Sequence, residues 1–159
     1  MSIPDGSVVV TSLRSTSFRT YILYPLVVVS WELILNEGQL RLEPWFFPLL
    51  AWGYLQYWLI GKYRIRCGGG GPGMDTPPER LVTSGPFAWC RNPMYLGHII
   101  FLLGLTLSLQ SVLAALITVA TAVWFHLRVQ RDEGRLAERF GQPYLDYAAR
   151  VRRWIPGIF

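Results

Sequence analysis

The sequence predicts an all-α integral membrane protein with about four transmembrane helices, the last two forming a helical hairpin, and a C-terminal cytosolic or interfacial helical segment. Three observations support this fold class. The 159-residue chain is 52% hydrophobic, with 7 Trp, 8 Tyr and 8 Phe, which is more apolar than a typical soluble domain. It contains three long apolar blocks, and its basic residues gather in the segments that flank one side of them. The length fits a single domain, 1–159.

The apolar blocks cover residues 18–35, 44–61 and 94–127. A spanning helix needs roughly 20 residues, so the first two blocks each predict one crossing. As one helix, the third would be roughly 50 Å long, well beyond a hydrocarbon core of about 30 Å. The polar interruption SLQS at 108–111 offers a turn. We therefore expect this block to fold into two helices packed as a hairpin.

The distribution of charge tests this choice independently, because Lys and Arg collect on cytoplasmic flanks. Four crossings with a cytosolic N-terminus place fourteen of the fifteen basic residues inside, and only Arg41 outside. A single crossing in the third block would put the seven arginines that follow Leu127 on the other face. We therefore predict a multi-pass membrane protein with both termini in the cytosol.

The remaining segments fall on the cytosolic side of this topology. Residues 62–84 read as a loop, and their Gly run lacks the Gly-Lys-Ser/Thr ending of a phosphate-binding loop, so we interpret it as a flexible linker. The last span should continue into the cytosol as a charged helix until Gly141 and Pro143 break it. A shorter amphipathic helix from about Tyr144 to Trp154 should follow at the membrane surface. Residues 1–75 then form a two-span region with a linker, and residues 76–156 form a catalytic region.

Several function classes fit poorly. The net charge of +5 comes without a basic stripe of recognition spacing, so we expect no nucleic-acid partner. Two cysteines form neither a disulfide framework nor a zinc site. His98 and His126 lack further convergent ligands, so we interpret them as packing residues and predict no metal. Gly97 and Gly104 are interpreted as sites of close helix contact.

The polar chemistry falls in two segments, 85–97 before the hairpin and 128–147 after it. A hairpin brings its two ends together, which predicts a polar chamber at the mouth of an apolar helix pair. Pro93 suits the first turn of a helix, whose free amides can receive an anionic group such as a carboxylate. The residues expected to meet in the chamber are Arg91, Asn92 and Tyr95 from the first segment, and Arg128, Asp132 and Glu133 from the second.

The string LVTSGPFAWCRNPMYLG (81–97), followed by RVQRDEGRLAERFGQPYLDYAARV (128–151), resembles the isoprenylcysteine carboxyl methyltransferases and the related membrane phospholipid methyltransferases. The resemblance covers roughly residues 79–156, about half of the chain. It implies that S-adenosyl-L-methionine is bound between the two segments at the cytosolic face, while a lipophilic substrate enters from the bilayer.

The resemblance also implies a role for each matching residue. The candidate cofactor-binding residues are Arg80, Leu81 and Val82 by their backbone, Phe87 against the adenosine, Asn92, Pro93, Met94 and Tyr95 in the family's Arg-His-Pro-x-Tyr signature, and Asp132 or Glu133 at the ammonium group. The candidate catalytic residues are Arg91 and Arg128, and Arg128 would meet the acceptor. The sequence departs from the family pattern at three of these positions, with Asn92 for His, Phe87 for Tyr and Asp132 for a longer acid. We expect these changes to weaken or shift cofactor contacts without changing the reaction class.

The residues themselves agree with methyl transfer. The cofactor needs donors, an acid and an aromatic wall, and a carboxylate acceptor needs only an arginine to orient it, whereas an amine must lose a proton. An isoprenylcysteine-like carboxylate is therefore the favoured acceptor. Four other readings stay open: a phospholipid amine N-methyltransferase, an NADPH-dependent oxidoreductase like the membrane steroid reductases, a non-catalytic membrane scaffold, and a plain helix cap beside a solvated helix face. The sequence leaves the acceptor and the oligomeric state unknown.

Overall fold

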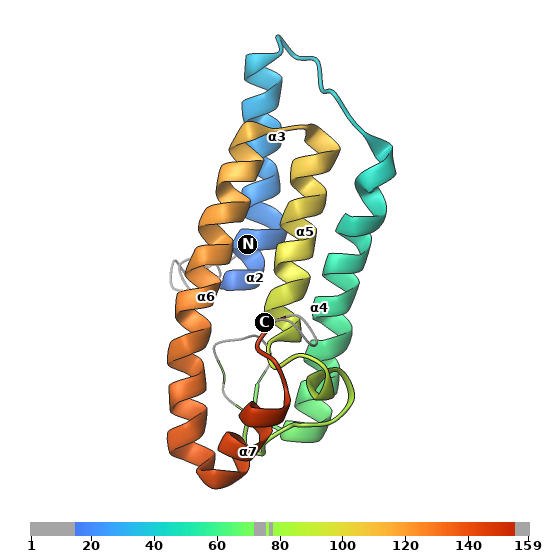
Figure 1. The fold of residues 1–159 in the computed structure, drawn as a ribbon. Coiled ribbons are helices and arrows are strands. Elements are labelled where there is room, and N and C mark those ends of the chain that lie inside the picture. The colour runs from blue at the N-terminus through green and yellow to red at the C-terminus, as the bar shows by residue number, and fades with distance from the viewer. Residues whose placement is uncertain (1–14, 72–75, 77, 155–159) are drawn as a thin grey trace, which may run out of the picture.

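The computed structural model describes residues 15–71, 76 and 78–154, and within these residues every regular element is helical (Figure 1). The elements in chain order are α2 (Thr16–Phe18), η1 (Arg19–Leu23), α3 (Tyr24–Leu35), η2 (Pro44–Phe46), α4 (Phe47–Gly68), η3 (Gly85–Ala88), α5 (Pro93–Leu109), α6 (Val112–Phe140) and α7 (Gln142–Arg150). The first three form one continuous helix with a wide π turn at η1. The predicted all-α class is confirmed for the described part of the chain.

The long helices lie side by side as a bundle, with α5 next to both α4 and α6 (Figure 1). The α5–α6 turn lies at one end of the bundle, and α7 lies at the other. We call these the turn end and the site end. Apolar side chains of α3, α5 and α6 form the core toward the turn end, whereas Tyr95, Phe125 and Val129 form a second cluster nearer the site end. The second cluster holds the start of α5 against α6.

The predicted hairpin is confirmed. Helix α5 ends at Leu109, Gln110 takes a left-handed conformation with φ of 50°, and Ser111 caps α6 by accepting a hydrogen bond from the Ala114 amide at 3.2 Å. The Ser111 hydroxyl also donates to Glu32 Oε1 at 2.6 Å, which joins the end of α3 to the start of α6. One serine thus stabilises the turn and attaches it to the rest of the bundle.

Glycines bring α4 and α5 into backbone contact. A Cβ at Gly97 would lie 2.9 Å from the Gly53 carbonyl oxygen, and one at Gly104 would lie 2.9 Å from the Leu50 amide nitrogen. Both predictions of close helix contact are therefore confirmed. His98, on the same helix, is fully buried among the rings of Tyr21 and Phe125, as a packing residue should be.

The prediction that a loop begins at Lys62 is wrong, because α4 continues to Gly68. Residues 62–67 contain no Gly or Pro, so nothing ends the helix before the glycine run, where Gly69 has a φ of 69°. The extension places Arg64 on the bundle side. Its guanidinium donates to the carbonyl oxygens of Gly71 and Thr76, both at 2.9 Å, and thereby holds the start of the glycine segment against α4.

The continuation of α6 beyond its apolar part is confirmed, since it runs to Phe140 and ends at Gly141, whose φ is 59°. The shorter helix that follows is α7, which begins and ends earlier than the predicted range of Tyr144 to Trp154. Among the described helices, two are long and apolar enough to cross a membrane, Thr16–Leu35 and Val112–Phe140, and α5 is apolar but shorter. The count of four crossings stays a prediction.

Candidate active site

The first part of the site is the connection that leads into α5. The turn η3 starts at Gly85, whose φ of 58° favours glycine, and Asn92 takes the position just before the first turn of α5. Pro93 occupies that first turn, as predicted, and is buried. The amides of a first turn have no partner within their own helix, so the start of α5 offers donors and the positive end of its dipole.

The second part is the middle of α6, where it leaves the apolar core. The Tyr95 hydroxyl donates to Asp132 Oδ2 at 2.8 Å, which joins the two predicted segments directly. Arg128 Nε lies 3.6 Å from the same carboxylate oxygen, and the Arg128 guanidinium also donates to the Thr16 hydroxyl at 3.3 Å. Its Cζ lies 5.3 Å from the Trp124 ring centroid, so an aromatic side chain also positions this arginine.

A cavity of about 400 Å³ lies where these parts meet. This volume falls within the roughly 300–1,000 Å³ typical of small-molecule sites. We call it the larger cavity, and it is lined by Arg64, Pro78, Phe87, Arg91, Asn92, Pro93, Met94, Tyr95, Arg128, Asp132, Arg135, Leu136 and Arg139. Eight of these were predicted site residues. Sequence reasoning missed Arg64, Pro78, Arg135, Leu136 and Arg139, although the 3–4-residue spacing after Asp132 is a signal that could have indicated the α6 residues.

A smaller cavity of about 70 Å³ shares several of these side chains. It brings in three more predicted residues, Leu81, Val82 and Glu133, together with the tyrosines of α7, Tyr144 and Tyr147. Arg80 lines neither cavity; it is exposed, and its backbone amide donates to the Gly68 carbonyl oxygen at 2.9 Å.

The two neighbouring acids of α6 have different surroundings. Asp132 lines the larger cavity, and its side chain is 28% exposed. Glu133 is only 11% exposed and lies 2.8 Å from Arg153 Nη2, 3.4 Å from Arg91 Nη2 and 3.3 Å from Asn92 Nδ2. The sequence left open which acid would hold an ammonium group. In the structure, Asp132 is the acid of the larger cavity.

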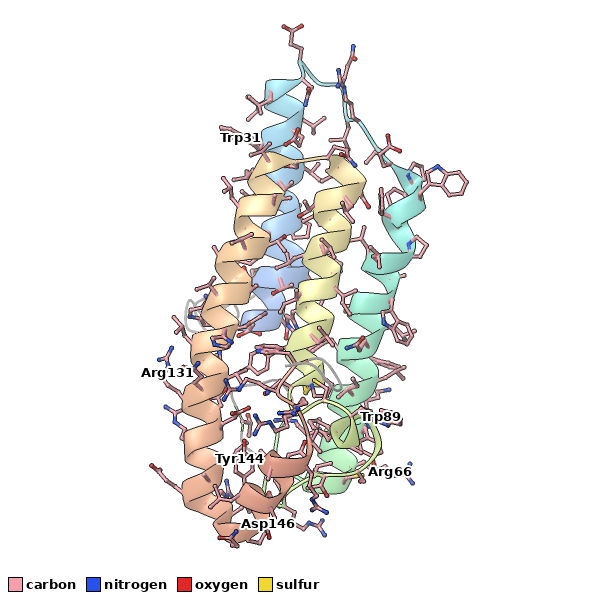
Figure 2. The ribbon with its side chains drawn as sticks, in the orientation of Figure 1. Trp31, Arg66, Trp89, Arg131, Tyr144 and Asp146 are labelled. Carbon is pink, nitrogen blue, oxygen red and sulfur yellow. The ribbon has the colours of Figure 1, made fainter. Side chains whose placement is uncertain are left out.

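The C-terminal segment, residues 142–154, contributes contacts that sequence reasoning missed. Trp154 packs on the cluster around Tyr95 and Phe125, and its indole N–H donates to His126 Nδ1 at 3.3 Å. Tyr144 and Tyr147 are both buried. Burial raises the pKa of Tyr144 to about 12, so its hydroxyl stays protonated at neutral pH. Figure 2 shows α7, with Tyr144 and Asp146 labelled, at the site end of the bundle.

The electrostatics of the larger cavity favour anionic groups. Five arginines line it, and Asp132 is the carboxylate among its lining residues. Burial raises the pKa of the Cys90 thiol, which therefore stays protonated at neutral pH. Within the part of the chain that the structure describes, no three His, Cys, Asp or Glu side chains are grouped to hold a metal ion.

Comparisons with known proteins match the same region. The family model described as phospholipid methyltransferase matches residues 54–143, more than half of the chain. The chain is 39% identical over 80 residues to protein-S-isoprenylcysteine O-methyltransferase of Mus musculus, covering 49% of this chain and 28% of that protein.

Two other relatives match over a similar length. Protein-S-isoprenylcysteine O-methyltransferase B of Arabidopsis thaliana is 35% identical over 82 residues, covering 50% of this chain and 41% of that protein. The nickel-cobalt-cadmium resistance protein NccN of Alcaligenes xylosoxydans xylosoxydans is 31% identical over 79 residues, covering 49% and 37%. The aligned region is thus less than half of each of these relatives.

Proposed function

Because the chain belongs to the phospholipid methyltransferase family, we propose that it is an integral membrane methyltransferase that uses S-adenosyl-L-methionine to methylate a lipophilic acceptor. The observation that carries the proposal is the larger cavity, which is bounded by the two segments that resemble the family. It combines helix-terminal donors, an acid, an aromatic side chain and arginines within one space of about 400 Å³.

The residues present fit the proposed cofactor. When bound, S-adenosylmethionine supplies a methyl group activated by a sulfonium. We propose that Asp132 binds the cofactor's ammonium group and that the first turn of α5, from Asn92 to Tyr95, receives its carboxylate. Phe87 lines the cavity and supplies an apolar wall for the adenine. The Tyr95 hydroxyl, which donates to Asp132 at 2.8 Å, keeps that carboxylate oriented.

We propose a carboxylate as the methyl acceptor, as in an isoprenylcysteine-like lipid. Arg128 lies beside the apolar cluster of Tyr95, Phe125 and Val129, so it can pair with a carboxylate whose lipid tail packs on the bundle. Such an acceptor is already a nucleophile at neutral pH, and the protein then has only to orient it and exclude water. An amine acceptor would need a base, and Asp132, the acid of the larger cavity, is assigned to the cofactor.

Binding and turnover assays on detergent-purified protein test the proposal. We expect titration with S-adenosylmethionine to show micromolar binding, equivalent to roughly −8 kcal/mol, and NADPH to show none. Radiolabelled methyl should then pass to a prenylated cysteine and not to phosphatidylethanolamine. Binding of NADPH alone would support a reductase, methylation of the phospholipid would reassign the acceptor, and no binding of either cofactor would leave a scaffold.

A further inference from the structure

The C-terminal segment lies directly behind the connection that forms the site. The Arg91 amide donates to the Arg152 carbonyl oxygen at 2.9 Å, and the Tyr147 hydroxyl donates to the Phe87 carbonyl oxygen at 2.8 Å. Phe87 and Arg91 both line the larger cavity, whereas Arg152 lines neither cavity. Residues of the C-terminal segment, more than 50 positions later in the chain, thus hold residues 87–91, which form part of the cavity wall.

One carbonyl group of this segment orders two neighbouring residues. The Arg153 carbonyl oxygen accepts from the Cys90 thiol at 3.5 Å and from Asn92 Nδ2 at 3.3 Å. The backbone N–H of Asn92 in turn donates to the Cys90 sulfur at 3.3 Å. Asn92 immediately precedes α5, so this carbonyl group contacts the residue that leads into the first turn of that helix.

Glu133 holds Arg153 in place. The Arg153 Nη2 and Nε atoms lie 2.8 Å and 3.1 Å from Glu133 Oε2, and Nε also lies 3.2 Å from Oε1. Such a bidentate ion pair is stronger and more directional than a single hydrogen bond. The hydrogen bond to Glu133 raises the pKa of Arg153 above its ordinary value, so the guanidinium stays charged throughout the physiological range.

These contacts leave Glu133 poorly placed for a ligand. Its carboxylate already receives Arg153 and Asn92, and Arg91 lies 3.4 Å away, with only 11% of the Glu133 side chain exposed. An incoming ammonium group would have to displace a guanidinium from a nearly buried carboxylate. Removing one partner of such a pair is costly, because it leaves the other charge buried and unpaired. Asp132 also has partners, with the Tyr95 hydroxyl at 2.8 Å, Arg128 Nε at 3.6 Å and Arg135 Nη1 at 3.7 Å. Its ion-pair distances are longer, however, and its side chain is 28% exposed and lines the larger cavity.

We infer that Glu133 is a positioning residue, whose ion pair with Arg153 holds the C-terminal segment against residues 87–92 and so fixes Asn92 and the first turn of α5 for cofactor binding. This inference rests on the proposed function, because the ligand it concerns is S-adenosylmethionine. It divides the two adjacent acids between two tasks: Asp132 contacts the cofactor's ammonium group, and Glu133 acts through Arg153 without touching the cofactor.

A double-mutant cycle on the full-length protein tests the inference. The variants are Glu133→Gln, Arg153→Met and the double variant, with Arg152→Met as the control, because it makes the same change at a neighbouring exposed side chain and keeps the Arg152 carbonyl group that contacts Arg91. Two quantities are measured for each: the affinity for S-adenosylmethionine by calorimetry, and hydrogen–deuterium exchange of the amides in residues 87–96. Asp132→Asn provides the comparison for loss of a direct contact.

We expect Arg153→Met to weaken binding about tenfold, the size of coupling common within one network, although Arg153 lines neither cavity. The double variant should bind no more weakly than Glu133→Gln, and both should show faster exchange in residues 87–96. Arg153→Lys keeps the positive charge but cannot make the bidentate contact, and it should recover part of the affinity for S-adenosylmethionine. Asp132→Asn should weaken binding without changing exchange, and Arg152→Met should change neither quantity.

Unchanged affinity in Arg153→Met, together with a loss in Glu133→Gln, would overturn the inference and make Glu133 a direct ligand. Additive losses in the double variant would have the same meaning. If Glu133→Gln does not fold, the two Arg153 variants decide the question, because the Arg153 side chain is 29% exposed and its replacement disturbs the packing less. Absence of cofactor binding by the unmodified protein would instead overturn the proposed function.

Discussion

Asp132 and Glu133 show how one residue step along a helix changes the use of a carboxylate. Successive residues on a helix point about 100° apart, so one acid can face the larger cavity while the next faces the C-terminal segment. Tyr95 and Arg128 approach Asp132 from the cavity side at 2.8 Å and 3.6 Å. The direction of the side chain, and not the acid itself, therefore determines the proposed role.

Replacing Asp132 with Asn should weaken binding of S-adenosylmethionine at least tenfold. The change keeps the shape but removes the charge proposed to meet an ammonium group, and hydrogen bonds to charged groups contribute about 1.5–3 kcal/mol. Calorimetry on purified protein measures the effect. Glu138→Gln is the matched control, because Glu138 lies on the same helix, is exposed and lines neither cavity. Equal affinities in the two variants would assign Asp132 to the solvated helix face.

Replacing Arg128 with Ala should separate turnover from cofactor binding. We expect cofactor affinity to stay within a few-fold, while kcat/KM for a carboxylate-bearing lipid falls by about two orders of magnitude, because the lost orientation acts in the transition state. Transfer of radiolabelled methyl measures the rate. Arg131→Ala is the control, since Arg131 lies on the outer side of α6 (Figure 2). Normal turnover in the Arg128 variant would make this residue a membrane anchor only.

At the scale of elements, the contact between α4 and α5 determines where the start of α5 lies. The two helices touch through backbone at Gly53, Gly97 and Gly104, so their separation is fixed by main-chain atoms and cannot be adjusted by side-chain rotation. The side-chain amide of Gln56 also donates to the Pro93 carbonyl oxygen at 3.0 Å, which links α4 to the first turn of α5. The position of the cavity wall at the start of α5 therefore depends on how closely α4 and α5 pack.

Gly53→Ala should destabilise the protein by about 1–3 kcal/mol, the usual cost of overpacking. A Cβ at this position would lie 2.5 Å from the Phe101 amide nitrogen, and backbone cannot move aside cheaply. The midpoint of thermal unfolding in detergent should fall. Gly134→Ala is the matched helical control, because nothing lies within 4 Å of its added Cβ, and it should leave the midpoint unchanged or raise it. A stable Gly53→Ala protein would mean that the two helices can separate.

At the scale of the whole molecule, the connection between α3 and α4 and the α5–α6 turn lie at one end of the bundle, and α7 lies at the other (Figure 1). The prediction of four crossings places the site end in the cytosol and the turn end on the opposite side of the membrane. Cysteines introduced at Gln39, Gly70 and Arg150 test it in a variant that lacks Cys67 and Cys90. A membrane-impermeant thiol reagent should label position 39 from outside and the other two only after the membrane is opened. Labelling of position 150 from outside would contradict the hairpin topology.

Much of this arrangement could be predicted from the sequence, because it depends on local signals. The 94–127 block with its SLQS interruption predicted the hairpin, and the hairpin required residues near Tyr95 to meet residues near Asp132. Arg64 was missed because it was assigned to a loop, although nothing before Gly68 ends the helix. Arg153 was missed because the sequence placed it in a helix at the membrane surface, whereas α7 ends at Arg150 and Arg153 follows in irregular chain.

The unbroken course of α6 has a consequence for how this chain can change in length. From the Ser111 cap to Asp132 the backbone climbs roughly 30 Å as a single helix, at about 1.5 Å per residue. One residue inserted between Ser111 and Asp132 would rotate every later residue of α6 by about 100° around the helix axis. Asp132 would then no longer face the cavity, although the insertion replaces no side chain. A residue added between Gln39 and Glu43, in the irregular connection between α3 and η2, leaves every such angle unchanged. Small insertions should therefore abolish cofactor binding within α6 and be tolerated in that connection.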